Sequence, residues 1–359
     1  MVQAGEQLID GIPLFAGIER AALDGFLRIF QPVSFAAGTP LMRQGQPADG
    51  AYIIESGDAD VTTALPGGGT AAVAKLGPGS VLGEMALLES GVRSATVIAL
   101  SQVTGHFIER EGFRMLLAQR NRAAFTVQAR IARTLCRRLR ELNTKIVADD
   151  ASGAAPPAAV FPAASRAAPG ASAVQPSRDS LSFEWRGFLP LLPFFRRCGP
   201  AEIEQFTGLA RAVELPRGHV LFSAGEPSTA CYLVVRGAIE IAGSRNGQRH
   251  RIGILGPGRL CGTLALIEGQ PHSMGAAVRE NALLLEIGKP AFDRLFDGDD
   301  RLAARFQEAI NLELLQALAR TNNHLTRLVS QARIRGGRQE KRQAEELQQA
   351  LGTQDCRTT

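Results

Sequence analysis

Apolar residues recur at two different spacings along this chain. From residue 12 to about residue 29, from about 110 to 146 and from about 300 to 333, they recur at helical spacing. Between residues 31 and 107, short apolar stretches alternate with turn-forming glycines, a pattern typical of an all-β barrel or sandwich. The pattern therefore predicts an α+β chain in which a compact β unit is flanked by helices.

The whole pattern occurs twice. Pro193-Phe194-Phe195 repeats Pro13-Leu14-Phe15 at an offset of 180 (193 − 13). Further matches at this offset are Gly38 and Gly218, Gly45 and Gly225, Tyr52 and Tyr232, and Gly57 and Gly237. Leu76-Gly77-Pro78-Gly79 is repeated by Leu255-Gly256-Pro257-Gly258 at an offset of 179 (255 − 76). An internal duplication of a domain explains a register held over so many positions.

A segment rich in Ala, Pro and Ser separates the two copies. Residues 148–183 hold almost no aromatic side chains and several helix-breaking prolines, so they cannot bury enough apolar surface to fold alone. We expect a first domain at 8–147, a linker at 148–183, a second domain at 184–333 and a polar, basic tail at 334–359.

Residues 82–97 of the first copy contain several residue types that are suited to binding a ligand. Gly83-Glu84 is followed by the short apolar run Met85-Ala86-Leu87-Leu88, long enough for about one helical turn, and then by Arg93-Ser94-Ala95. Backbone amides at a helix start and a guanidinium can both face an anion. A carboxylate can accept hydrogen bonds from sugar hydroxyls. The combination predicts a pocket for a small sugar phosphate.

This stretch resembles the phosphate-binding cassette of cyclic nucleotide-binding domains, which occur in catabolite activator-type regulators, protein kinase A regulatory subunits and gated channels. The first copy departs from the family pattern only at Val92, where proline is common. The resemblance implies two β-roll domains of double-stranded β-helix, jelly-roll-like fold, each flanked by helices and ending in a long helix. It also implies cAMP or cGMP as the ligand.

The resemblance assigns a role to each polar position of the first cassette. The phosphate is expected on backbone amides near Met85 and Ala86 and on Ser94 and Ala95. Arg93 would neutralise its charge, and Glu84 would hold the ribose 2′-hydroxyl, with Gly83 shaping the turn. Ser94 does not distinguish cAMP from cGMP.

The second cassette keeps the scaffold and loses the charged groups. Gly262 matches Gly83 and Ser273 matches Ser94, whereas Thr263 replaces the glutamate and His272 replaces the arginine. A neutral histidine offers a single donor in place of a charged, planar fork. We expect this degenerate second site to bind cyclic nucleotide poorly or not at all; a pocket repurposed for another ligand is the alternative.

The helix predicted at about 110–146 carries a heptad-like seam and a basic face. The seam comprises Leu135, Leu139, Leu142 and Ile146, and the basic face comprises Arg130, Arg133, Arg137, Arg138, Arg140 and Lys145. Packing on its own β unit and pairing in a homodimer are both compatible with this pattern.

The composition and the motifs that are missing reduce the number of functional classes to consider. The net charge of +5 permits nucleic-acid contact without requiring it. The apolar runs are too short for a membrane span, and the first ten residues do not resemble a signal peptide. Five scattered cysteines favour reduced thiols and a cytoplasmic location. No phosphate-binding P-loop, paired metal-binding histidines or catalytic triad is recognisable, so neither a catalytic site nor a metal site is expected.

Three functions fit these observations. The first is a cytoplasmic cyclic nucleotide sensor, not an enzyme, that signals through its long helix to a homodimer partner or an unknown effector protein. The second is a ligand-independent scaffold. The third is a catabolite activator-type regulator, although the residues after Arg333 are too few for a recognisable helix-turn-helix, so nucleic acid is not favoured.

Overall fold

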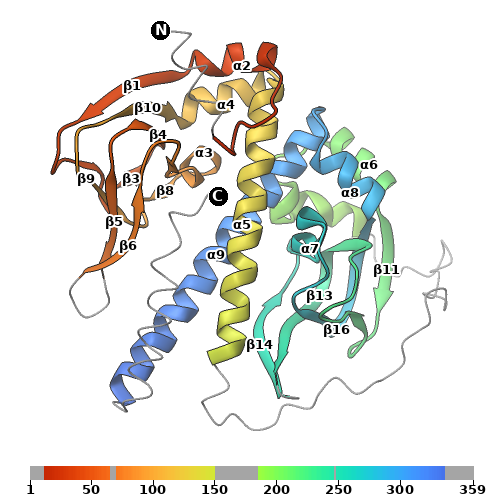
Figure 1. The fold of residues 1–359 in the computed structure, drawn as a ribbon. Helices are drawn as coiled ribbons and strands as arrows, with labels where there is room; N and C mark the ends of the chain where they lie inside the picture. Colours follow the sequence, from red (N-terminus) through yellow and green to blue (C-terminus); the bar gives the residue numbers. More distant parts are fainter. Residues whose placement is uncertain (1–11, 65–69, 150–184, 246–247, 336–359) are drawn as a thin grey trace. The chain divides into compact units, whose positions relative to one another are not determined.

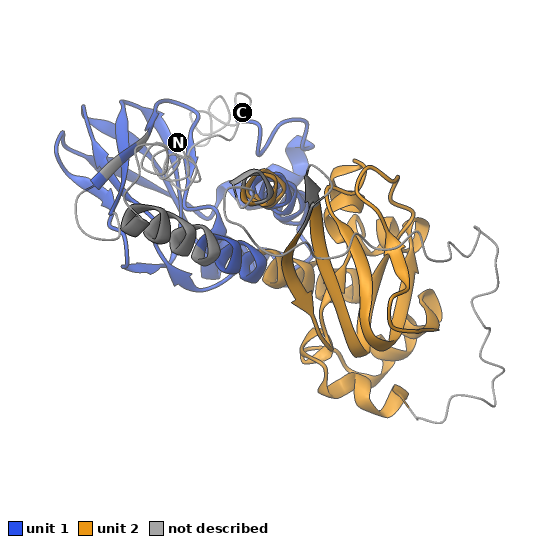
Figure 2. Cartoon of the chain, turned by 90° about the horizontal axis from the view of Figure 1, so that it is seen from below, with its two compact units in different colours: residues 1–138, 315–359 blue, residues 139–314 orange. Residues whose placement is uncertain are grey.

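The computed structural model describes residues 12–64, 70–149, 185–245 and 248–335. The chain forms two compact units, which Figure 2 colours separately: residues 1–138 with 315–359, and residues 139–314. The division falls inside two long helices, α5 (Arg122–Asp149) and α9 (Arg301–Arg335). The predicted linker from residue 150 onward, and the predicted tail from residue 336 onward, lie outside the described residues, so the predicted domain boundaries stay predictions.

The first unit contains a β-roll between helices (Figure 1). One antiparallel sheet has the strand order β1-β10-β4-β7, a second has the order β2-β9-β5-β6, and β3 pairs with β8. These strands are β1 (Phe30–Phe35), β2 (Pro40–Met42), β3 (Pro47–Ala48), β4 (Gly50–Ser56), β5 (Ala59–Ala64), β6 (Thr70–Leu76), β7 (Val81–Leu82), β8 (Gly91–Val92), β9 (Thr96–Ala99) and β10 (Val103–Glu109). The predicted β unit is confirmed.

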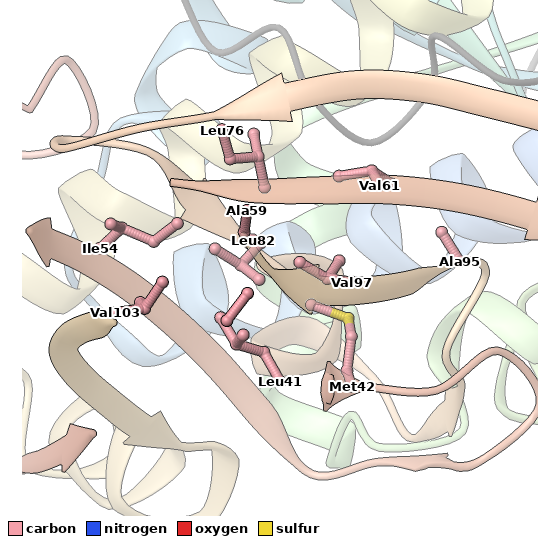
Figure 3. Packing of buried hydrophobic residues seen from close by; sticks show 11 residues of the cluster. Leu41, Met42, Ile54, Ala59, Val61, Leu76, Leu82, Ala95, Val97 and Val103 are labelled. Atoms are coloured by element: carbon pink, nitrogen blue, oxygen red, sulfur yellow. The ribbon is translucent and has the colours of Figure 1, made fainter. Parts of the chain in front are cut away.

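Alternating side chains of these strands form the core of the roll. In β5, Ala59 and Val61 are buried while Asp60 and Thr62 are half-buried, as expected where successive side chains point to opposite faces. Figure 3 shows side chains from several strands meeting in this core. The cluster comprises Leu41, Met42, Ile54, Ala59, Val61, Leu76, Leu82, Ala95, Val97, Ala99 and Val103.

The first predicted helix is shorter than expected. Helix α2 spans Arg20–Leu27, whereas residues 13–17 form turns that end at Gly17, whose φ is +66°. The guanidinium of Arg130 donates to the carbonyls of Leu14 (3.0 Å) and Ala16 (2.6 Å). These carbonyls are therefore satisfied by a side chain rather than by helix amides, and the apolar spacing did not reveal this.

The helix predicted at about 110–146 is two helices, α4 (Arg110–Ala118) and α5. Arg120 has a φ of +58°, a left-handed conformation that ends an α-helix. Asn121 then begins the next helix, because its Oδ1 accepts a hydrogen bond from the backbone amide of Ala124. A single residue between two apolar stretches thus sets the break.

The apolar seam of α5 is already covered within the chain. Leu135, Leu139, Leu142 and Ile146 are each at most 3% exposed. This burial leaves little apolar surface on the seam for a second copy, and it does not show packing on the first β unit, because Leu139, Leu142 and Ile146 belong to the second compact unit. A homodimer stays a proposal.

The second unit repeats the β-roll with longer strands (Figure 1). Its antiparallel sheet has the order β11-β16-β13-β14, with β12 paired to β16 and β15 paired to β13. The strands are β11 (Arg211–Leu215), β12 (Val220–Phe222), β13 (Ala230–Arg245), β14 (Gln248–Leu255), β15 (Leu260–Cys261) and β16 (Gly275–Gly288). Its helices include η2 (Trp185–Leu191), η3 (Pro193–Phe195), α6 (Pro200–Leu209), α7 (Thr263–Glu268), α8 (Lys289–Phe296) and the part of α9 up to Leu314.

Helix α9 confirms the third predicted helix and extends two residues past the predicted end. Within the second unit Leu302, Phe306, Ile310 and Leu314 are buried, which is the predicted apolar face. Among the described helices, none has the length and apolar character that crossing a membrane requires.

Candidate functional site

The first cassette is built around a left-handed glycine. Gly83 follows β7, has a φ of +73°, and leads into α3 (Met85–Leu88), the single helical turn expected from the sequence. A Cβ at this position would lie 2.2 Å from Nη1 of Arg93. Gly83 is therefore required both for its backbone conformation and to leave room for the guanidinium.

The guanidinium of Arg93 is buried beside α3 and held in a fixed orientation. Its Nη1 donates to the carbonyl of Gly50 (2.7 Å), and its Nη2 pairs with Oδ1 of Asp49 (2.8 Å). The carboxylate of Asp49 is 68% exposed, so water screens this ion pair. The ring of Tyr52 lies 5.7 Å from the guanidinium carbon. The arrangement presents a positioned cation that is only weakly neutralised.

Tyr52 places an uncharged aromatic ring beside the guanidinium of Arg93. Burial raises the pKa of its phenol; the positive charge of Arg93 opposes this rise, and the negative charge of Asp49 reinforces it. The phenol therefore stays protonated at neutral pH, and its ring face is available to the guanidinium.

The carboxylate of Glu84 stands at the start of α3 and is also buried. Its side chain is 5% exposed, and Nη1 of Arg138 on α5 lies 3.2 Å from its Oε1. The same Nη1 lies 3.8 Å from Sδ of Met85. The cassette thus contains a buried carboxylate and a buried guanidinium, whereas the ligand roles expected of Glu84 and Arg93 stay predictions.

The remaining residues predicted to bind the phosphate differ in solvent exposure and in whether their amides are already bonded. Ser94 is exposed, whereas Ala95 is buried and belongs to the core cluster. The amide of Ala86 already donates to the carbonyl of Gly83 (3.0 Å). An anion reaching this amide would have to share that hydrogen bond.

The second cassette repeats the backbone of the first with different side chains. Gly262 has a φ of +89° and precedes α7, as Gly83 precedes α3. The backbone of His272 pairs with Gly225 and Glu226 as that of Arg93 pairs with Gly45 and Gln46. The scaffold predicted to survive the loss of charge is present.

The side chain of His272 occupies this second pocket as a neutral ring. It is 6% exposed and stacks on Phe222, with ring centroids 3.7 Å apart and planes inclined by 9°. Burial lowers the pKa of His272 to about 4; the charge of Glu226 opposes this shift, and that of Arg140 adds to it. Thr263 is 3% exposed, and Ser273 is half-buried. At neutral pH the second cassette therefore offers an uncharged, stacked surface in place of Arg93 and Glu84.

The sequence prediction of the site did not include two residues that contact the charged groups of the first cassette, Asp49 and Arg138. Asp49 lies 44 positions before its partner Arg93. Its counterpart in the second copy is Thr229, so this position loses its charge together with the positions of Glu84 and Arg93. That joint loss between the copies could have identified Asp49. Arg138 was only one of several arginines on the basic face of its helix.

No group of side chains suited to a metal ion occurs in the described part of the chain. Cys261, which precedes the second cassette, is buried, and burial raises the pKa of its thiol. This cysteine is thus an apolar core residue at neutral pH.

Comparisons with known proteins agree with this geometry. Residues 32–120 and 212–299 each match the family model described as cyclic nucleotide-binding domain. The CRP-like cAMP-activated global transcriptional regulator of Mycobacterium tuberculosis is 26% identical over 141 residues, which are 39% of this chain and 61% of that protein. The Cyclic AMP receptor protein of Thermus thermophilus is 33% identical over 136 residues, 38% of this chain and 61% of that protein.

A third relative covers both copies. The cAMP-dependent protein kinase regulatory subunit of Mycosarcoma maydis is 24% identical over 298 residues, 79% of this chain and 46% of that protein. The chain thus spans less than two thirds of the length of each of these relatives. With both copies matched by one family model, the chain contains two cyclic nucleotide-binding domains, homologous to protein kinase A regulatory subunits and to CRP-like regulators.

Proposed function

We propose that the first domain binds one cyclic nucleotide and that the second domain binds none. The observation that carries this proposal is the contrast between the buried guanidinium of Arg93 and the neutral ring of His272 on equivalent backbone positions. A cyclic phosphate needs a cation within a partly dehydrated pocket, and only the first cassette offers one.

In this proposal each group of the first cassette has one task. Arg93 neutralises the phosphate and donates to it, while the amides near Met85, Ser94 and Ala95 add neutral donors. Glu84 accepts the ribose 2′-hydroxyl, because its carboxylate is buried beside the start of α3. Gly83 leaves room for the guanidinium of Arg93, which a side chain at this position would displace.

The names of the relatives favour cAMP. The regulators from M. tuberculosis and T. thermophilus and the kinase subunit from M. maydis are all named for cAMP. Ser94 gives no preference of its own, so cGMP is the competing ligand.

The output runs through α5 in this proposal. Arg138 of α5 pairs with Glu84. A ribose hydroxyl that donates a hydrogen bond to this carboxylate therefore competes with Arg138. A coupling of about 1–3 kcal/mol between ligand and helix would be enough for signalling. The receiving partner is a second copy of this chain or an effector protein, in the cytoplasm.

Isothermal titration of the full chain with cAMP, and separately with cGMP, tests the proposal. We expect one site per chain. Arg93→Leu should abolish measurable binding at micromolar protein, since each charged hydrogen bond lost is worth roughly 1.5–3 kcal/mol. His272→Leu is the matched control at the equivalent position and should leave the titration unchanged.

Two results would overturn the proposal. The absence of heat with either nucleotide would favour the ligand-independent scaffold. Two sites per chain, one lost in His272→Leu, would place a ligand in the second cassette. Circular dichroism of each variant establishes that lost binding is not lost folding.

A further inference from the structure

The second cassette contacts a guanidinium through its outer rim. Nε of Arg140 lies 2.5 Å from Oε2 of Glu268, and Nη1 of Arg140 donates to the carbonyl of Pro271 (2.9 Å). All three residues belong to the second unit, residues 139–314. Arg140 lies in the C-terminal half of α5, so that half of the helix is attached to the rim of the second cassette.

The sequence of the second cassette explains why its rim can accept this arginine. Helix α7 ends at Gly269, which has a φ of +63° and caps the helix in the left-handed conformation. The counterpart of Gly269 in the first cassette is Ser90, and there the helix ends earlier, with Glu89 in an extended conformation. Glycine adopts the left-handed cap at little cost, so α7 continues to Glu268.

The equivalent rim of the first cassette is arranged differently. Glu89, the counterpart of Glu268, accepts hydrogen bonds from the amide and hydroxyl of its neighbour Ser90, both at 3.3 Å. Val92, the counterpart of Pro271, is 67% exposed. The duplication thus provides an internal comparison: in the second copy the two positions contact an arginine, whereas in the first copy Glu89 is half-buried and bonded to Ser90, and Val92 is exposed.

The contact with Arg140 is stronger than an ordinary surface ion pair. The side chains of Arg140 and Glu268 are 24% and 11% exposed, so water screens their charges only in part. The guanidinium also meets two acceptors in different directions, which fixes its orientation as well as its distance. Such a contact is suited to holding a helix in place.

We propose that the second cassette has exchanged ligand binding for the anchoring of α5, with Glu268 and the Pro271 carbonyl as a receptor for the guanidinium of Arg140. The inner pocket is filled by the stack of Phe222 and His272, and the outer rim binds the helix. The inference extends the proposed function by giving the nucleotide-free second domain a role. Arg138, two residues before Arg140 in the same helix, pairs with Glu84 of the first cassette.

Hydrogen exchange of the full chain without nucleotide tests the anchoring, so the result does not depend on ligand binding by the first domain. We expect Arg140→Gln and Glu268→Gln to accelerate amide exchange in residues 139–149 by roughly tenfold to hundredfold, the range for a lost charged hydrogen bond. Glu89→Gln is the matched control and should change nothing in these residues. The charge swap Arg140→Glu with Glu268→Arg should restore slow exchange in part, because the ion pair is re-formed but a carboxylate at position 140 cannot donate to the Pro271 carbonyl.

Three outcomes would overturn the anchoring. The first is unchanged exchange of residues 139–149 in both single variants. The second is equal acceleration across β13 and β16, which would mean general destabilisation of the second unit. The third is a charge swap that exchanges as fast as the single variants, because the effect would then not come from the pair.

Discussion

Arg138 lies 3.2 Å from the carboxylate of Glu84, and this ion pair joins the long helix α5 to the first cassette. The two side chains are 10% and 5% exposed, so their interaction is little weakened by water. A ligand hydroxyl that hydrogen-bonds to Glu84 acts on a group that the helix already holds. If Glu84 holds the ligand as proposed, this ion pair links the ligand to the helix within the first unit.

The first prediction concerns this ion pair. Arg138→Gln should leave nucleotide affinity within about tenfold of the unchanged chain, because Arg93 still neutralises the phosphate. It should remove the change in amide exchange that the ligand causes in residues 122–138 of α5, because the helix no longer shares Glu84. Exchange with and without saturating cAMP measures this. Persistence of the ligand-induced change in the variant would contradict this link.

The second prediction compares two glycines of the first unit. Gly83 and Gly79 have φ values of +73° and +83°, but an added Cβ meets Arg93 only at Gly83, and nothing lies within 4 Å of one at Gly79. Gly79→Ala should cost about 1–2 kcal/mol of unfolding free energy from backbone strain alone and keep ligand binding. Gly83→Ala should cost at least as much and also weaken cAMP binding tenfold or more.

Urea denaturation and calorimetric titration of both variants separate the two effects. Equal affinities for cAMP in Gly83→Ala and Gly79→Ala would show that displacement of Arg93 does not matter. The comparison isolates the clash, because both variants carry the same kind of backbone strain.

The sequence predicted the parts of this site that depend on residues close together along the chain. Gly83, the single turn of α3 and the position of Arg93 follow from residue types at fixed spacing within sixteen residues. The spacing of glycines and apolar stretches predicted an all-β barrel or sandwich, and the resemblance to cyclic nucleotide-binding domains implied a β-roll. Such features are set by neighbours along the chain, where periodicity and turn chemistry are informative.

The sequence did not predict the contacts made over long separations. Asp49 reaches Arg93 across 44 positions, and Phe222 stacks on a histidine 50 positions later (272 − 222). Neither partner has a local signal, because which side chains meet depends on strand register and loop path. The break at Arg120 was missed for another reason: one left-handed residue leaves the apolar spacing on both sides unchanged.

The third prediction concerns the pH dependence of stability. The pKa of His272 is about 4 in the folded chain and about 6.5 when unfolded, so between these values the unfolded state binds more protons. The contribution of His272 to the free energy of unfolding should therefore be complete above pH 6.5 and decrease as the pH drops towards 4. For this side chain the loss between pH 7 and pH 5 should be about 1–2 kcal/mol.

His272→Gln removes the titrating group and keeps a polar side chain of similar length. Urea denaturation at pH 7 and pH 5 should show a smaller loss of unfolding free energy in the variant than in the unchanged chain. Carboxylates titrate equally in both proteins, so the difference between them reports His272. An identical pH dependence would mean that the imidazole is protonated in the folded state.

The fourth prediction is that the second cassette can be made to bind cyclic nucleotide again. Its backbone pairing matches that of the first cassette, so we attribute the proposed loss of nucleotide binding to the changed side chains. Thr229→Asp, Thr263→Glu and His272→Arg restore the three charges found at Asp49, Glu84 and Arg93. Phe222→Met is needed as well, because the phenyl ring stacks where the new guanidinium must lie and Met42 occupies the matching place in the first unit.

Calorimetric titration of this fourfold variant with cAMP should show two sites per chain, the second weaker than the first by one to two orders of magnitude because its surroundings were not adapted to the ligand. The matched control carries the first two changes and Phe222→Met, with His272→Gln in place of His272→Arg, and should show one site. If the fourfold variant folds and still shows one site, then the second pocket differs from the first in its backbone as well as in its charges. If the control also gains a site, the guanidinium is not the group that decides between the two cassettes, and the assignment of Arg93 as the phosphate partner in the first domain fails with it.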